Sequence, residues 1–178
     1  QPAGNKIAGN PSNHPALSVK WVEDFPDIPL NRDEAYKLRV TSKGIEIEAI
    51  TETGVYRAIQ TLRQLTEKKG NGIAITGCEI TDWPAFRIRG FMQDVGRTYI
   101  PVDELKREIA ILARYKINVF HWHLTENQAW RLQSKVFPML NDSVNTTRQP
   151  GKYYTLEEAR ELASFCKQHH VLLIPEID

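Results

Sequence analysis

The second half of the chain alternates between strand-like and helix-like segments, and this alternation restricts the folds available to it. Apolar runs at 88–95, 119–125 and 171–177 are separated by two segments, 102–115 and 156–168, whose apolar residues recur at helical spacing. Strands joined through helices form right-handed crossovers and lie parallel in one sheet. The sequence therefore predicts an α/β unit with three parallel strands and two helices.

A different pattern precedes Pro84. Two arms with period-two alternation, 36–41 and 45–49, predict a β-hairpin with its turn at Ser42-Lys43-Gly44. Apolar residues at helical spacing over 53–67 predict a helix across one face of the hairpin. Further short strands are predicted at 16–22 and 73–76. The sequence before Pro84 therefore predicts a small α+β layer.

The two patterns meet at Thr81-Asp82-Trp83-Pro84, where the proline holds Trp83 extended and ends regular pairing. We therefore expect a small α+β domain at 16–84 and the α/β domain at 85–178. Residues 1–15 are rich in Pro, Gly and Asn without any period, which predicts a flexible lead-in. No signal peptide is recognised at the start of the sequence.

Composition excludes several classes of protein. The chain of 178 residues carries 23 basic and 22 acidic side chains, so no general affinity for nucleic acid is expected. No apolar run approaches the ~20 residues that a membrane helix needs. Cys78 and Cys166 are the only cysteines, and their apolar surroundings predict two buried free thiols.

Two histidines occupy a strand that should be apolar if it is buried in a parallel sheet. Alternation places His121 and His123 on one face and Trp122 on the other. The pair could present two nitrogens to a zinc ion, or each imidazole could be satisfied by nearby carboxylates or water. No cysteine, third histidine or aspartate at ligand spacing supports the zinc site, so we expect no metal.

Polar residues also mark the carboxyl ends of the predicted strands, where parallel α/β folds keep their sites. The segment from 126 to 154 that follows the second strand is a long loop with little helical pattern, which is typical of functional loops. We expect the strand-end residues to converge on a polar ligand. They are Glu126 and Asn127 after the second strand and Glu176 and Asp178 after the third, joined by Arg89 and Asp94 within the first strand.

Taken together, these segments resemble the retaining β-N-acetylhexosaminidases of glycoside hydrolase family twenty. The resemblance rests on four motifs: Phe86 to Arg97, Leu112 to Thr125, Gln128-Ala129-Trp130-Arg131, and Ile174-Pro175-Glu176-Ile177-Asp178. It implies a (β/α)₈ TIM barrel, which needs ~250 residues when complete. Residues 85–178 would then be the first three strands of an incomplete barrel, preceded by a shortened small domain.

The resemblance also implies a substrate-assisted mechanism, in which the 2-acetamido oxygen of the sugar attacks its own anomeric carbon. Arg89, His123 and Glu126 are expected to bind the terminal sugar, although Glu126 stands where many members have aspartate. Asp178 is expected to support the general acid. The acid itself belongs to an Asp-Glu pair after the fourth barrel strand, beyond residue 178, so this chain alone is expected to be inactive.

Other functions stay open on the sequence. A non-catalytic carbohydrate-binding module of the same fold would lack the acid, and a metal-dependent amidohydrolase-type barrel would use His121 and His123. The expected partner is a glycan or amino-sugar oligosaccharide, with no cofactor and no membrane. Unpaired strand edges would favour a homo-oligomer. The family implies a secreted or periplasmic protein.

Overall fold

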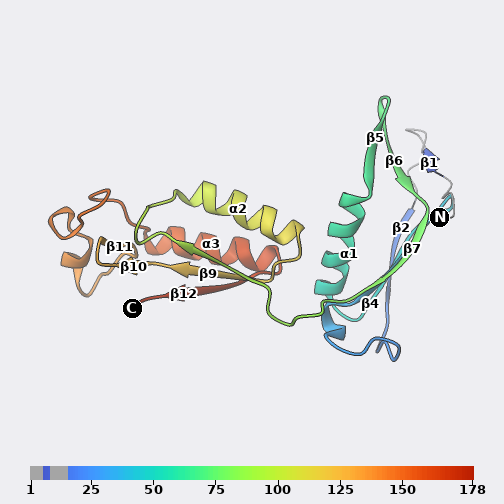
Figure 1. Ribbon diagram of the computed structural model, residues 1–178, viewed down its shortest axis with the longest axis horizontal. Helices are drawn as coiled ribbons and strands as arrows, with labels where there is room; N and C mark the ends of the chain where they lie inside the picture. Colours follow the sequence, from blue (N-terminus) through green and yellow to red (C-terminus); the bar gives the residue numbers. More distant parts are fainter. Residues whose placement is uncertain (1–5, 9–15) are drawn as a thin grey trace. The chain divides into compact units, whose positions relative to one another are not determined.

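The computed structural model describes residues 6–8 and 16–178, and the chain separates into two compact units, 1–87 and 88–178 (Figure 1). Helices and strands occur in both units, which confirms the mixed α/β class. Lys6–Ala8 form strand β1 within the predicted lead-in. The rest of that lead-in, 1–5 and 9–15, lies outside the described residues.

A four-stranded sheet in the order β2-β4-β3-β7 forms the core of the first unit. The predicted hairpin is confirmed, with Leu38 opposite Ile47 in an antiparallel register. One apolar face of the hairpin is fully buried and packs against helix α1. The elements are β2 (Ala16–Trp21), β3 (Tyr36–Thr41), β4 (Gly44–Ala49), α1 (Glu52–Gln64), β7 (Cys78–Asp82) and the 3₁₀ helix η1 (Arg32–Glu34).

Helix α1 is shorter than the sequence predicts, and its expected last turn is a strand. Strands β5 (Thr66–Lys69) and β6 (Gly72–Thr76) pair in an antiparallel hairpin, and β1 pairs with the other edge of β6. Gly70 adopts the left-handed conformation with φ 59°, which a tight hairpin turn between Lys69 and Gly72 requires. Lys68 and Lys69 are therefore paired strand residues, and Gly70 lies in the turn of the hairpin.

Three parallel strands build the sheet of the second unit, in the order β12-β9-β8, and so confirm the predicted parallel arrangement. Helices α2 and α3 lie together over one face of this sheet (Figure 1). Helix α3 begins at a capping box that Thr155 and Glu158 form. The elements are β8 (Gly90–Asp94), α2 (Val102–Arg114), β9 (Val119–His123), α3 (Leu156–Gln168) and β12 (Leu172–Glu176).

The two faces of this sheet differ in chemistry. Phe120, Trp122 and Leu124 are fully buried on the covered face. His121 and His123 alternate with them and so lie on the opposite face. The sheet thus separates an apolar core beneath the helices from a polar face on its other side.

The long loop after β9 is folded rather than extended. The loop contains a short hairpin, whose two strands have two residues each, and two 3₁₀ helices. An isolated β-bridge joins Leu132 to Tyr154, at the end of the loop. The expected scarcity of α-helix is confirmed. The elements are β10 (Thr125–Glu126), β11 (Ala129–Trp130), η2 (Pro138–Asn141) and η3 (Ser143–Asn145).

The cysteines differ from expectation in one respect. Cys166 is buried in α3, where burial raises the pKa of its thiol to about 11. Cys78 is only half-buried because it lies at the start of β7, at the edge of its sheet. Over the described part of the chain, no helix has both the length and the apolar character needed to cross a bilayer.

Candidate active site

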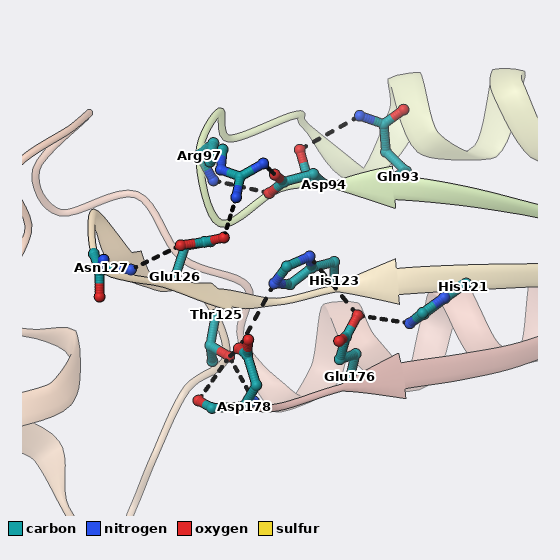
Figure 2. Close-up of polar contacts among 10 residues, drawn as sticks. All are labelled: Gln93, Asp94, Arg97, His121, His123, Thr125, Glu126, Asn127, Glu176 and Asp178. Atoms are coloured by element: carbon teal, nitrogen blue, oxygen red, sulfur yellow. Dashed lines mark hydrogen bonds and ion pairs between the residues drawn. The ribbon is translucent and has the colours of Figure 1, made fainter.

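The parallel register aligns polar side chains from all three strands of the second unit. Asp94 of β8 and Glu176 of β12 are both register partners of His123 in the central strand β9. Residues paired in this way point to the same face of a sheet. Figure 2 shows these side chains, together with those that follow each strand, gathered around the carboxyl ends of the strands. The predicted convergence of strand ends is therefore confirmed for this group.

Glu176 lies between the two imidazoles of β9. Its Oε2 is 2.7 Å from His121 Nε2 and 3.7 Å from His123 Nδ1. His121 is therefore held by a carboxylate, which is the second of the two interpretations of the histidine pair. Both imidazoles face the same carboxylate oxygen of Glu176.

His123 also faces a second carboxylate. Its Nε2 is 3.6 Å from Asp178 Oδ1, which is too long for a hydrogen bond. The His123 side chain is nine-tenths buried, and Nε2 has no hydrogen-bond partner. One nitrogen of His123, one oxygen of Glu176 and one of Asp178 all lie within 4.8 Å of one another, so these three residues could hold a metal ion.

Thr125 fixes Asp178. The Thr125 hydroxyl donates to Asp178 Oδ1 at 2.6 Å and accepts from the Asp178 backbone N–H at 3.0 Å. The hydroxyl bond and, to a smaller extent, the charge of His123 hold the pKa of the exposed Asp178 carboxyl below its ordinary value. Asp178 is thus an ionised carboxylate at neutral pH.

Glu126 and Asp94 share a single cation. Arg97 forms an ion pair with Glu126, and its Nη1 is 3.3 Å from Asp94 Oδ2. The Arg97 backbone N–H also donates to Asp94 at 3.0 Å. Asn127 donates its backbone N–H to Glu126 at 3.2 Å, so this carboxylate is fixed from two sides.

A cavity of about 500 Å³ opens next to these carboxylates. Residues of the long loop form its outer wall and the strand ends form its inner wall. Its lining includes Glu126, Trp130, Met139, Asn145 and Asp178. The cavity therefore combines carboxylates with apolar surface, as sites for small polar molecules do.

Arg89 lies apart from this group. It immediately precedes β8, and its Nε donates to the Lys116 carbonyl at 2.8 Å. Five residues of extended chain separate it from Asp94, which corresponds to about 16 Å along the strand. The structure thus brings together His123, Glu126 and Asp178 but places Arg89 at the amino end of the sheet, and its role in sugar binding stays a prediction.

Arg131 is a residue whose importance sequence reasoning missed. Its guanidinium is buried and donates to four backbone carbonyls at 2.7–3.2 Å: Val95, Arg148, Gln149 and Lys152. These bonds tie the far end of the long loop to the end of β8. The motif at 128–131 marked the position, but its neighbours in sequence do not reveal that carbonyls from distant segments surround the arginine.

Comparison with known proteins defines the class of this fold and site. Residues 86–178 match the catalytic domain of glycosyl hydrolase family 20, and residues 4–83 match domain 2 of that family. The chain therefore belongs to glycoside hydrolase family 20, as the motifs indicated.

Individual relatives agree with this assignment. A β-hexosaminidase of Porphyromonas gingivalis is 38% identical over 85% of this chain and 21% of its own length. A β-N-acetylhexosaminidase of Cellulomonas fimi is 35% identical over 92% of this chain and 34% of its own. The chain thus spans between about a fifth and a third of these relatives.

Solved structures show the same similarity. The β-N-acetylhexosaminidase of Bacteroides fragilis superposes with a TM-score of 0.81 at 34% identity, over 91% of this chain and 33% of that one. An exo-β-N-acetylglucosaminidase of Vibrio harveyi, solved with N-acetylglucosamine, gives a TM-score of 0.77 at 34% identity, over 91% and 27%.

Proposed function

We propose that the protein carrying this chain is an exo-acting β-N-acetylhexosaminidase that releases terminal β-linked GlcNAc or GalNAc from glycans. The observation that carries the proposal is the gathering of His123, Glu126, Glu176 and Asp178 at the carboxyl ends of three parallel strands. Family membership supports the same activity, because the relatives from Porphyromonas gingivalis and Cellulomonas fimi are named hexosaminidases. Secretion or a periplasmic location would suit an enzyme acting on such glycans.

The fold fits the first part of a (β/α)₈ barrel. In this arrangement β8, β9 and β12 are barrel strands one to three, with α2 and α3 on the outside and the polar face inside. Active sites of such barrels sit at the carboxyl ends of the strands. The observed cluster occupies that end of the sheet.

Within this proposal each residue has a distinct task. Glu126, fixed by Arg97, accepts hydrogen bonds from ring hydroxyls of the terminal sugar, and His123 lines the floor beside it. Sugar binding by Arg89 is proposed from the family resemblance alone, because a guanidinium offers several fixed donors to adjacent hydroxyls. Asp178 is ionised and faces the position from which it can orient a general acid.

The chemistry is substrate-assisted. The acetamido oxygen of the sugar displaces the leaving group, a neighbouring Asp-Glu pair orients the acetamide and protonates the departing oxygen, and water then opens the cyclic intermediate. That pair follows a fourth barrel strand in the family pattern. We therefore expect the 178 residues in isolation to be inactive.

A comparison of two chromogenic substrates tests the proposal. The full-length protein that carries this chain should hydrolyse 4-nitrophenyl N-acetyl-β-D-glucosaminide and should not hydrolyse 4-nitrophenyl β-D-glucoside, which lacks the nucleophilic acetamide, whereas the 178 residues in isolation should hydrolyse neither. Equal hydrolysis of both would contradict the substrate-assisted mechanism. Saturable binding of GlcNAc without any turnover would instead favour the non-catalytic sugar-binding module.

A further inference from the structure

We propose that the long loop after β9 carries a binding surface for an apolar leaving group, so that the enzyme prefers N-acetylhexosaminides of alkyl or aryl alcohols. This inference rests on the proposed hydrolase function and names the class of substrate that the site takes. Four large apolar side chains of the loop are between 66% and 81% exposed. They are Val136, Phe137, Met139 and Val144, called here the apolar rim. Figure 1 shows the loop, in orange, beyond the carboxyl ends of the parallel strands.

The apolar rim continues the wall of the cavity. Met139 is exposed and also lines the cavity, together with Leu140 of the same 3₁₀ helix η2. Val144 lies in η3, which packs against η2, and the Asn145 side chain donates to the Met139 carbonyl at 2.8 Å. Trp130 of β11 lines the same cavity. Apolar surface therefore runs from the inside of the cavity to the outside of the loop.

The position of Asp178 brings the leaving group to this wall. In the proposed mechanism the general acid protonates the glycosidic oxygen, and Asp178 orients that acid. The leaving group begins at the same oxygen and so starts close to Asp178. Asp178 lines the cavity together with Met139 and Leu140. A leaving group that extends from Asp178 out of the cavity therefore passes over the apolar rim.

The charges around the cavity favour a neutral leaving group. The cavity lining includes the carboxylates of Glu126 and Asp178, and no Lys or Arg among the described residues lines it. Arg97 pairs with Glu126, whereas the cationic partner that Asp178 can have is the imidazole of His123. A sulfate or carboxylate on the leaving group would meet like charge here, which costs binding free energy.

The apolar rim also favours an alkyl or aryl group over a second sugar. Its valine and phenylalanine side chains have no hydrogen-bonding atoms, so sugar hydroxyls placed over them would lose water without gaining a partner. An alkyl or aryl group instead removes apolar surface from water on both sides of the contact. The amides of Asn127 and Asn145 line the cavity, so they serve only the part of the leaving group nearest the bond that breaks.

Hydrogen bonds hold the loop in this conformation. Asn141 Nδ2 donates to the Leu132 carbonyl at 3.0 Å, and its Oδ1 accepts from the Ser134 backbone N–H at 2.7 Å. The Phe137 backbone N–H donates to the Ser134 hydroxyl at 3.0 Å. A surface that is ordered before binding loses less conformational entropy when a ligand arrives. The apolar rim is therefore a preformed surface.

Two substrates that differ only in the leaving group test the inference on the full-length protein. Methyl and hexyl N-acetyl-β-D-glucosaminide share the sugar and the linkage, and their alcohols are of similar acidity. One methylene in an apolar pocket changes kcat/KM by about 10-fold or more, so the longer chain on this open surface should raise kcat/KM by at least about 10-fold. Release of GlcNAc measures both reactions. Equal kcat/KM for the two substrates would overturn the proposal.

Variants of the apolar rim assign the preference to this surface. The double variant Phe137→Ser, Val144→Ser should bring kcat/KM for the hexyl substrate close to that for the methyl substrate, whose own kcat/KM should change little. Both side chains are exposed, so the variant should fold. Ile111→Ser is the matched control, because Ile111 is a 58% exposed side chain of α2 and should not affect the preference. A preference that survives the double variant would contradict the assignment.

The remaining outcomes separate this inference from the hydrolase itself. A full-length protein that hydrolyses neither glucosaminide contradicts the hydrolase and, with it, the apolar rim as a substrate site. Faster hydrolysis of N,N′-diacetylchitobiose than of the hexyl substrate would keep the hydrolase but show that a second sugar occupies the surface. Equal losses on the methyl and hexyl substrates in the double variant would also overturn the inference, because the loop would then act on the reaction in general.

Discussion

The four-stranded sheet of the first unit and the parallel sheet of the second differ in how some of their charged residues are compensated. In the first unit, charges pair across short distances: Lys20 with Glu48 at 2.7 Å and Arg39 with Glu79 at 2.8 Å. In the second unit, Glu176 and Asp178 stand beside imidazoles, without a Lys or Arg partner among the described residues.

The difference separates structural charge from chemically available charge. Exposed ion pairs cancel each other and contribute little to stability. Carboxylates that lack a fixed cation retain their field and their open lone pairs, which is the condition for binding a hydroxyl, a proton donor or a metal ion. The charges of the first sheet are therefore mutually compensated, whereas Glu176 and Asp178 in the second unit remain available to a ligand.

The largest loss of stability should come from removing one partner of the buried ion pair between Arg57 and Glu34 in the first unit. Arg57 is buried, and its Nε donates to Glu34 Oε2 at 2.8 Å. Arg57→Met leaves the Glu34 carboxylate buried without its cation, so the free energy of unfolding should fall by about 3–5 kcal/mol. Urea unfolding measures this loss.

The double variant checks the cause. Replacing both Arg57 and Glu34 by Met removes the stranded charge and should cost much less than the sum of the two single variants. Additive losses would mean that packing, rather than charge compensation, explains the effect of Arg57.

Next in size is the effect of an uncompensated carboxylate on catalysis. In the full-length protein, Asp178→Asn removes the charge proposed to orient the general acid, so kcat on 4-nitrophenyl N-acetyl-β-D-glucosaminide should fall about 100-fold. The melting curve should stay unchanged because the side chain is largely exposed.

The matched control lies in the other sheet. Glu79→Gln breaks an exposed pair with Arg39 and should leave kcat unaltered. If Asp178→Asn retained full kcat or unfolded the protein, the functional half of the comparison would be wrong.

Local sequence predicted most of the second unit because its pattern is repeated and strong. The two helices and three parallel strands follow from apolar periodicity, and the capping box of Thr155 and Glu158 marks the start of α3. The convergence of Glu176, His123 and Asp178 follows from the rule that parallel strand ends share an edge.

Long-range contacts account for what the sequence did not predict. The helix predicted over 53–67 wrongly includes Thr66 and Glu67, because strand β5 gains its conformation only by pairing with β6. The role of Arg131 depends on carbonyls 17 to 36 residues away, in both chain directions. Arg89 carries a motif position, but its contact with Lys116 is set by tertiary packing.

A smaller effect distinguishes the two units through the pKa values of Asp27 and Asp178. A hydrogen bond from the Lys37 ammonium lowers the pKa of exposed Asp27, whereas the neutral Thr125 hydroxyl is the main cause of the low pKa of Asp178. Salt screens the charged pair more than the neutral bond. Added salt should therefore raise the pKa of Asp27 more than that of Asp178.

Carboxyl ¹³C NMR titration measures both groups. Because both pKa values are lowered by folding, each carboxylate stabilises the fold at neutral pH, and this stabilisation is lost as pH falls through the lowered pKa. Thr125→Val should raise the pKa of Asp178 and leave that of Asp27 unchanged. A Thr125→Val protein with an unaltered Asp178 titration would show that the hydroxyl is not the cause.

The smallest effect should come from an exposed pair in the first sheet. Arg39 and Glu79 are 58% and 74% exposed, so water already solvates both charges and the 2.8 Å contact adds little. Glu79→Gln should lower the free energy of unfolding by less than about 1 kcal/mol, and 1 M salt should remove the difference. Urea unfolding at low and high salt measures it. A loss comparable to that of Arg57→Met would mean that exposed charges in this sheet carry its stability, and the distinction between buried and surface compensation would have to be abandoned.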